Sequence, residues 1–81
     1  MDSIARTPQQ LGQALRSRRA KLRLSQTEVG SSVGMKQDTV STLEIRTPSS
    51  TVETLYKALS ALGLELVIRE KAQTTHSAQE W

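Results

Sequence analysis

The sequence predicts an all-α domain of four short helices, followed by a single β-strand and a polar tail. Three observations lead to this fold class. Hydroxyl residues that can cap helices precede stretches with apolar residues at helical spacing. A glycine, Gly34, joins two of these stretches through a tight turn. A run of mainly branched apolar residues at 64–69 is typical of a strand.

The length and composition limit the chain to a small domain. Its 81 residues predict one domain with a marginal core, which oligomerisation can supplement. It has no cysteine and no apolar run long enough for a membrane span or signal peptide, so we expect a cytoplasmic protein without membrane contact. Lysine and arginine outnumber acidic residues by eight to four in residues 1–48, but not in 49–81. A polyanion would therefore meet the N-terminal part.

The first helix is predicted from Thr7 to about Leu22. Thr7 can cap it, Pro8 suits its first position, and Gln10 completes a capping box. Arg19 falls on the apolar line of this helix, so its charge is expected to have a partner. The leucines of that line are Leu11, Leu15 and Leu22.

The second and third helices are predicted within residues 25–44, on either side of Gly34. Ser25 can cap the second helix, and Glu28 completes a capping box three residues later. The third helix is expected over residues 35–44, directly after the glycine turn.

Four positions of this segment meet the requirements of a helix-turn-helix. Counted from Gln26 as the first, position five is Gly30, which lets the two helices approach closely. Position nine is Gly34, which makes the turn, and positions fifteen and eighteen are Val40 and Leu43, which pack the second helix. A helix-turn-helix places its second helix in a DNA groove, so DNA binding is the leading functional hypothesis.

The fourth helix follows a predicted loop at residues 47–50, because Pro48 disfavours helix at the residue before it. A capping box of Ser50 and Glu53 is expected to open this helix, and Gly63 to end it. The expected apolar stripe comprises Val52, Leu55, Tyr56, Leu59 and Leu62.

The strand is expected over residues 64–69 and has no partner strand in this chain. The same strand of a second copy is the simplest partner, which predicts a two-stranded sheet in a homodimer. Leu64, Leu66 and Ile68 are the expected dimer residues. The alternative is a dimer formed by a longer fourth helix that packs on its symmetry mate.

Residues 70–81 are expected to form a flexible tail that follows a DNA-binding and dimerisation domain at 7–69. The tail ends in Trp81, the only tryptophan. This aromatic is either incidental or an anchor for a pocket of another protein, because tryptophan is enriched among interface hot spots.

Residues 10–62 resemble the repressors of the phage Cro/C1 and Xre type, which have a lambda-repressor-like fold. The stretch LSQTEVG at 24–30 is similar to the LSQxxLA opening of that family, and residues 40–44 are similar to its recognition helix. The resemblance implies that Gln26 holds a phosphate. It also implies that the following residues read bases: Lys36, Gln37, Asp38 and Ser41.

The chemistry of these side chains suits that role. Gln37 can pair bidentately with adenine, Lys36 can donate to guanine, and Ser41 can serve a base or a phosphate. Asp38 departs from the pattern: it either accepts from cytosine N4 or favours the helix dipole from the first turn. Arg46, directly after the recognition helix, is well placed for a phosphate.

The resemblance further implies a structural ion pair between Arg19 and Glu44. The family usually has glycine near residues 23 and 46, so the arginines here are expected to alter both turns. The remaining basic residues of the region are typical of a solvated face: Arg16, Arg18, Lys21 and Arg23.

The C-terminal third is similar to HipB-type antitoxins. The similarity rests on the strand after the fourth helix, the closing residues Glu80 and Trp81, and the pattern MKQxxVS at 35–41. It implies a repressor of its own operon with three partners: double-stranded operator DNA, a second copy of the chain, and a HipA-type serine/threonine kinase toxin. A stand-alone Xre/Cro-like regulator and a protein-interaction adaptor stay open as alternatives. No enzyme and no cofactor are expected, because the single histidine, His76, lies in the tail.

Overall fold

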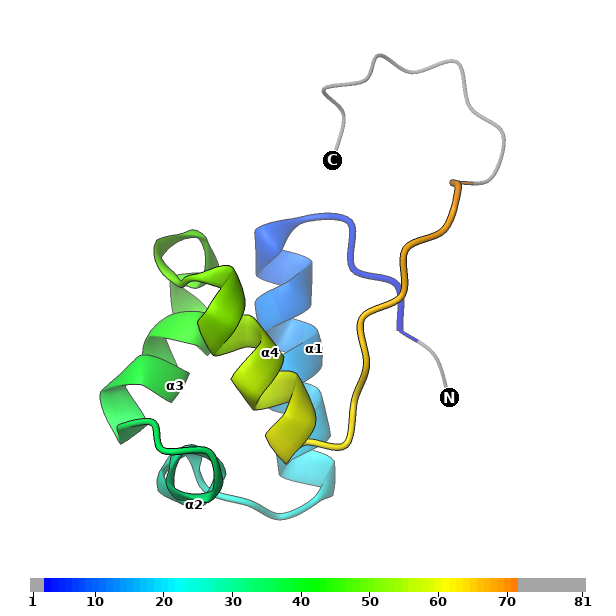
Figure 1. The fold of residues 1–81 in the computed structure, drawn as a ribbon. Helices are drawn as coiled ribbons and strands as arrows, with labels where there is room; N and C mark the ends of the chain where they lie inside the picture. Colours follow the sequence, from blue (N-terminus) through cyan, green and yellow to red (C-terminus); the bar gives the residue numbers. More distant parts are fainter. Residues whose placement is uncertain (1–2, 72–81) are drawn as a thin grey trace.

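The structure, a computed structural model, describes residues 3–71. These residues form four α-helices and one 3₁₀-helix (Figure 1). The elements are α1 at Pro8–Lys21, α2 at Gln26–Ser32, α3 at Gln37–Ile45, η1 at Thr47–Ser49 and α4 at Val52–Ala61. The all-α fold class with four helices is therefore confirmed. Over the described range, no helix is long and apolar enough to cross a membrane.

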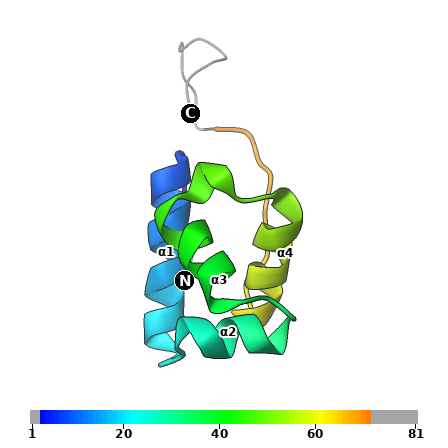
Figure 2. The same ribbon diagram turned by 90° about the vertical axis from the view of Figure 1, so that its left-hand side faces the viewer.

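Helix α3 is packed on several sides. It contacts α1, α2, η1 and α4, and Figure 2 shows α2 running across one end of the bundle, beneath α1 and α4. The inner residues of α3, Val40 and Leu43, are almost fully buried. They share one apolar cluster with Leu15, Val29, Ala58, Leu59 and Leu62. Because the core fixes its inner face, α3 can present its outer face rigidly.

The caps of α1 and α2 follow the sequence closely. The Thr7 hydroxyl accepts the Gln10 amide at 3.1 Å, but the Gln10 side chain accepts the amide of Arg6 rather than that of Thr7. The capping box of Ser25 and Glu28 is complete, with hydrogen bonds of 3.0 and 2.8 Å. The pKa of Glu28 lies below its ordinary value, because the Ser25 amide, and after it the Ser25 hydroxyl, stabilises the charged carboxylate.

Two glycines shape the turn between α2 and α3. A Cβ on Gly30 would lie 2.4 Å from the carbonyl oxygen of Met35, so even alanine is too large for this contact. Gly34 has a φ of +72°, in the left-handed region that favours glycine. The small residue at position five and the glycine at position nine therefore have the roles predicted for them.

The predicted loop before the fourth helix is wrong, because Thr47–Ser49 forms η1. This turn is held by the buried Thr47 hydroxyl, which donates to the Leu43 carbonyl at 2.7 Å. The amide of Ser50 then donates to the Thr47 carbonyl at 3.0 Å. Ser50 thus closes η1, one residue before the N-cap of α4.

The predicted capping box of Ser50 and Glu53 is consequently wrong by one residue. Thr51 is the N-cap of α4, and its hydroxyl accepts the Thr54 amide at 3.0 Å. The predicted apolar stripe is also too wide. Val52 and Tyr56 are 68% and 53% exposed, because the inner face of α4 turns Leu55, Ala58, Leu59 and Leu62 toward the core.

The chain leaves the bundle after Gly63 and runs outside the helices (Figure 1). Residues 64–71 form neither strand nor helix, because backbone pairing needs a second strand and the described residues 3–71 contain none. The alternative of a longer fourth helix is wrong, since α4 ends at Ala61. Trp81 and the rest of the tail beyond Lys71 lie outside the described residues.

Candidate nucleic-acid interface

The start of α3 presents a row of polar side chains to solvent. Lys36 is the N-cap residue, and Gln37 and Asp38 form the first turn; all three are exposed. Ser41, half-buried, lies one turn further along the same face. At the other end of α3, Arg46 is exposed as the C-cap residue. Exposed polar or charged side chains therefore stand at both ends of α3.

Several of these side chains are available to bind. Within residues 3–71 the side chains of Lys36, Asp38 and Arg46 make no hydrogen bond or ion pair. Two are cationic and can contact phosphate or guanine, and Asp38 can only accept when it is ionised. The face therefore carries both donors and acceptors, which reading different bases requires.

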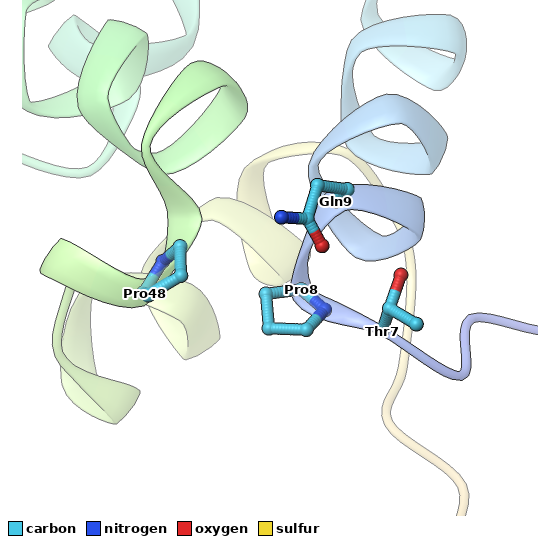
Figure 3. Close-up of a pocket in the computed structure, with 4 residues that line it drawn as sticks. All are labelled: Thr7, Pro8, Gln9 and Pro48. Carbon is cyan, nitrogen blue, oxygen red and sulfur yellow. The ribbon is translucent and has the colours of Figure 1, made fainter. Parts of the chain in front are cut away.

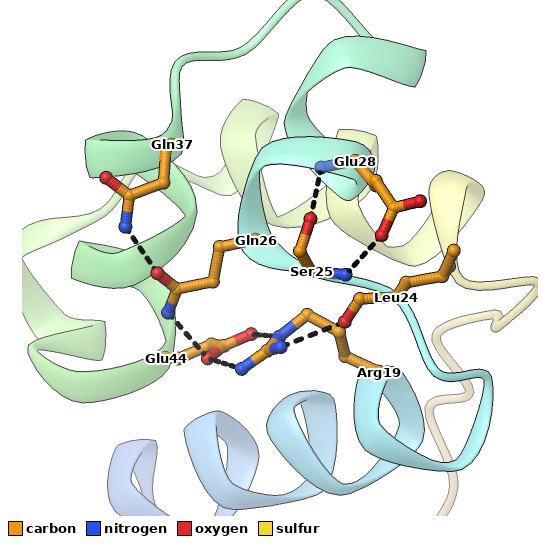
Figure 4. Close-up of polar contacts among 7 residues, drawn as sticks. All are labelled: Arg19, Leu24, Ser25, Gln26, Glu28, Gln37 and Glu44. Carbon is orange, nitrogen blue, oxygen red and sulfur yellow. Dashed lines mark hydrogen bonds and ion pairs between the residues drawn. The ribbon is translucent and has the colours of Figure 1, made fainter.

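An ion pair between Arg19 and Glu44 lies behind this face (Figure 4). The two nitrogens Nε and Nη2 of Arg19 donate to the two carboxylate oxygens of Glu44 at 2.6 and 3.0 Å. The side chains are only 17% and 3% exposed. The pair therefore joins α1 to α3 in a bidentate geometry within the protein.

The same arginine also fixes the start of α2. Its Nη1 donates to the carbonyl oxygen of Leu24 at 3.0 Å, in the turn before α2. The pKa of Arg19 is raised, chiefly by its hydrogen bond to Glu44; burial opposes this rise, and the charge of Glu44 adds to it. Arg19 thus holds three helices in a fixed relation and is not accessible as a DNA ligand.

A chain of amide side chains connects this ion pair to the exposed face of α3 (Figure 4). Gln26 Nε2 donates to Glu44 at 3.1 Å, and Gln26 Oε1 accepts from Gln37 Nε2 at 2.5 Å. Gln26 and Gln37 are therefore oriented by a path that begins in the buried carboxylate. Sequence reasoning missed this link, because residues 11 positions apart on two different helices leave no periodic signal.

Gln26 and Gln37 keep hydrogen-bonding groups that these contacts do not use, and these free groups can contact DNA. An amide nitrogen has two N–H groups. Gln37 spends one of them on Gln26, and keeps the second N–H together with its carbonyl oxygen. Adenine offers an N7 acceptor and an N6 donor in the major groove, which this remaining pair matches. Gln26 likewise keeps one N–H, which a phosphate oxygen can accept.

The basic residues of α1 and of the turn after it divide into two groups. Arg18 is half-buried and donates from Nε to the Leu62 carbonyl at 2.9 Å, so its assignment to a solvated face is wrong. This bond ties α1 to the end of α4. Arg16, Lys21 and Arg23 are exposed as expected. Arg23 alters its turn, because it has a φ of +57°, where a glycine is favoured.

A shallow hollow between the start of α1 and η1 does not resemble a ligand site. It is lined by Thr7, Pro8, Gln9 and Pro48 (Figure 3), and none of these can serve as an acid, a base or a strong metal ligand. The described part of the chain also holds no cluster of side chains suited to a metal ion. The polar face of α3 is thus the better candidate site.

Comparison with known proteins places the chain beside DNA-binding proteins. The helix-turn-helix domain family matches residues 10–72. A HipB variant in complex with an O2 20mer is 28% identical, with 89% of this chain and 99% of that chain covered and a TM-score of 0.82. A HipA–HipB–O2–O3 complex and a HipB–O4 20mer complex are each 28% identical and cover 89% of this chain and 100% of the other, with TM-scores of 0.81. Among curated protein sequences, none matches.

Proposed function

This chain belongs to the helix-turn-helix domain family, a DNA-binding and non-enzymatic family, and on that basis we propose that it is a transcriptional repressor and HipB-type antitoxin. In this proposal a homodimer binds operator DNA, represses its own operon and neutralises a HipA-type serine/threonine kinase. The observation that carries the DNA-binding part is the oriented Gln37, with one N–H and one carbonyl left for adenine. Such a regulator acts where the DNA is, in the cytoplasm.

Each exposed group on α3 then has a defined role. The start of a recognition helix contacts base edges, so Lys36 donates to guanine, Gln37 pairs with adenine and Asp38 accepts from cytosine. Ser41, one turn on, contacts a neighbouring base or phosphate. Arg46 binds a phosphate beyond the end of α3. In a homodimer two such faces meet half-sites about 34–36 Å apart, or a multiple of that distance.

Gln26 has two roles in this proposal. Its remaining N–H donates to a DNA phosphate, while its carbonyl oxygen keeps Gln37 in the orientation that adenine requires. Phosphate contact and base reading are therefore coupled through the Gln26 side chain. The position of the protein along the DNA backbone and its base specificity then depend on each other.

Replacing Gln37 with alanine is expected to cost about 1–3 kcal/mol at one base pair and to relax specificity there. Replacing Arg46 with alanine should instead weaken binding to all sequences alike and reduce the salt slope by about one. Fluorescence anisotropy measures both effects, with the upstream DNA of the chain's own operon, its single-base variants and several salt concentrations. Gln13→Ala, on the exposed surface of α1, is the matched control. Absence of a salt-sensitive specific complex with the unmodified protein would refute the repressor.

The homodimer is supported by the apolar segment that leaves the bundle. Leu64 is half-buried, while Leu66 and Ile68 are 46% and 91% exposed. An extended apolar segment with unpaired backbone groups favours pairing with another strand. We assign that role to residues 64–69 of a second copy, whose paired strands would cover the apolar side chains.

The kinase partnership is supported by one likeness: a HipB structure 28% identical to this chain contains HipA. Within this proposal we assign the kinase contact to Trp81, the only tryptophan, which lies outside the described residues. Deleting residues 79–81 should leave operator affinity unchanged and reduce capture of a co-expressed HipA-type kinase, measured by pull-down and by kinase inhibition. Unchanged capture would show that the tail is incidental. Absence of any kinase gene beside this one favours the alternative, a stand-alone Xre/Cro-like regulator.

A further inference from the structure

We propose that the protein distinguishes unmodified adenine from N6-methyladenine at the base that Gln37 reads, and that Gln26 is the positioning residue for this distinction. The inference rests on the proposed repressor function and adds to it a sensitivity to the methylation state of the operator. It follows from the order of donors and acceptors along the hydrogen-bonded path from Glu44 through Gln26 to Gln37 (Figure 4).

The buried carboxylate of Glu44 sets the direction of every hydrogen bond in this path. Glu44 is paired with Arg19, and an ionised carboxylate can only accept. Gln26 must therefore turn its amide nitrogen toward Glu44, which leaves its carbonyl oxygen facing Gln37. Gln37 must in turn present an N–H to that oxygen. Reversing the amide of either glutamine would bring two acceptors together, so the path has one stable direction.

The exposed end of the path is the amide of Gln37. This side chain makes no other hydrogen bond within residues 3–71, so one N–H and the carbonyl oxygen remain for DNA. An exposed glutamine without an anchor samples several rotamers. The bond to Gln26 selects one of them. Gln37 therefore meets the DNA with its donor and its acceptor already in fixed positions.

Methylation of adenine at N6 removes the group that the Gln37 oxygen would use. The N6 amino group has two N–H bonds: one pairs with thymine, and the other points into the major groove beside the N7 acceptor. A single methyl group leaves one N–H, and the base pair requires it. The methyl group therefore takes the groove position, where it offers no donor and crowds N7.

An anchored glutamine cannot adapt to this methyl group. Its oxygen would lie against a carbon atom without a hydrogen bond, and its N–H would be kept from N7. Rotating the amide away from the methyl group breaks the bond to Gln26 and leaves the Gln26 oxygen without its donor. An unanchored glutamine would lose only its contact with the base. The anchor therefore increases the discrimination against the methylated base, which is the role we assign to Gln26.

Operator duplexes with N6-methyladenine at one adenine at a time test the inference. The readout is the ratio of the dissociation constants for the methylated and the unmodified duplex, measured by fluorescence anisotropy. With the natural protein we expect a ratio of about 5 to 150 at the adenine that Gln37 contacts, and of about 1 at adenines elsewhere in the duplex. The sensitive adenine should be the base at which Gln37→Ala relaxes specificity.

Three variants assign the effect to individual side chains. Gln37→Ala should bring the ratio to about 1, because alanine lacks the amide and leaves room for the methyl group. Gln26→Met should reduce the ratio about 2- to 10-fold, since methionine fills a similar space without the anchoring amide. Arg46→Ala is the matched control, because loss of a phosphate contact weakens binding to both duplexes alike and leaves the ratio unchanged. For the same reason the ratio is independent of the phosphate contact that Gln26→Met removes.

The outcomes separate this inference from the proposed function. The inference is overturned if the unmodified operator is bound but no adenine gives a ratio above about 2, or if Gln37→Ala keeps the ratio of the natural protein. An undiminished ratio in Gln26→Met overturns the positioning role of Gln26. A protein that forms no specific complex with the unmodified operator overturns the repressor itself. A ratio that is lost in Gln37→Ala and reduced in Gln26→Met supports the inference.

Discussion

Replacing Glu44 with alanine is expected to lower the free energy of unfolding by about 3–5 kcal/mol. Its carboxylate is 3% exposed and accepts hydrogen bonds from Arg19 and Gln26. Without the carboxylate, the Arg19 guanidinium, only 17% exposed, keeps its charge but has no anionic partner, and the Gln26 amide loses its hydrogen-bond acceptor. Urea denaturation measures the loss. Glu53→Ala, which removes an exposed acid from α4, should change stability by less than about 1 kcal/mol.

A double substitution separates the stability of the ion pair from its role in orienting Gln26. Arg19→Met combined with Glu44→Leu replaces the pair by apolar side chains and should recover most of the stability, because a buried pair costs much desolvation. Operator affinity should nevertheless stay reduced, since Gln26 has lost its anchor and Gln37 loses its orientation in turn. If the double variant binds DNA as tightly as the natural protein, the path from Glu44 to Gln37 has no functional role. If Glu44→Ala alone costs less than about 1 kcal/mol, the pair behaves as an exposed one.

The fold was predictable from sequence where signals are local. Ser25 with Glu28 forms the expected capping box. The same pattern at Ser50 and Glu53 misleads, because Ser50 is the last residue of the η1 turn and the cap of α4 is Thr51. The sequence offers two adjacent hydroxyl residues there, and only the packing of Thr47 beneath α3 decides between them. Local pattern thus predicts that a helix begins, and tertiary contacts set the residue at which it begins.

The candidate site was predictable in its exposed residues but not in their connections. Arg19 stands on the apolar line of α1, which predicts a partner, but Arg18 beside it gives no such signal. Arg18 nevertheless binds a backbone carbonyl 44 residues away, and carbonyls occur at every position, so residue type cannot mark such a bond.

Replacing Gly12 with alanine is expected to lower the free energy of unfolding by about 2–4 kcal/mol. A Cβ at this position would lie 2.3 Å from the Glu44 carbonyl oxygen and 2.5 Å from the Thr47 hydroxyl oxygen. One neighbour is backbone, so α1 has to move away from α3 and η1. Within a helix, alanine is more favourable than glycine by about 1 kcal/mol. A net loss of stability would therefore show that the steric clash costs more than this gain in helix propensity.

Gly34→Ala provides the contrast that identifies the cause. Gly34 has a φ of +72° and no atom within 4 Å of a Cβ, so its substitution costs only backbone strain, about 1–2 kcal/mol. Gly12→Ala should therefore destabilise the protein more than Gly34→Ala, although Gly12 has ordinary helical backbone geometry. It should also weaken operator binding in the fraction that stays folded, because α3 is displaced from α1. A stabilised Gly12→Ala variant would mean that the two helices separate at no cost, and that the position of α3 is set by α2 and α4 alone.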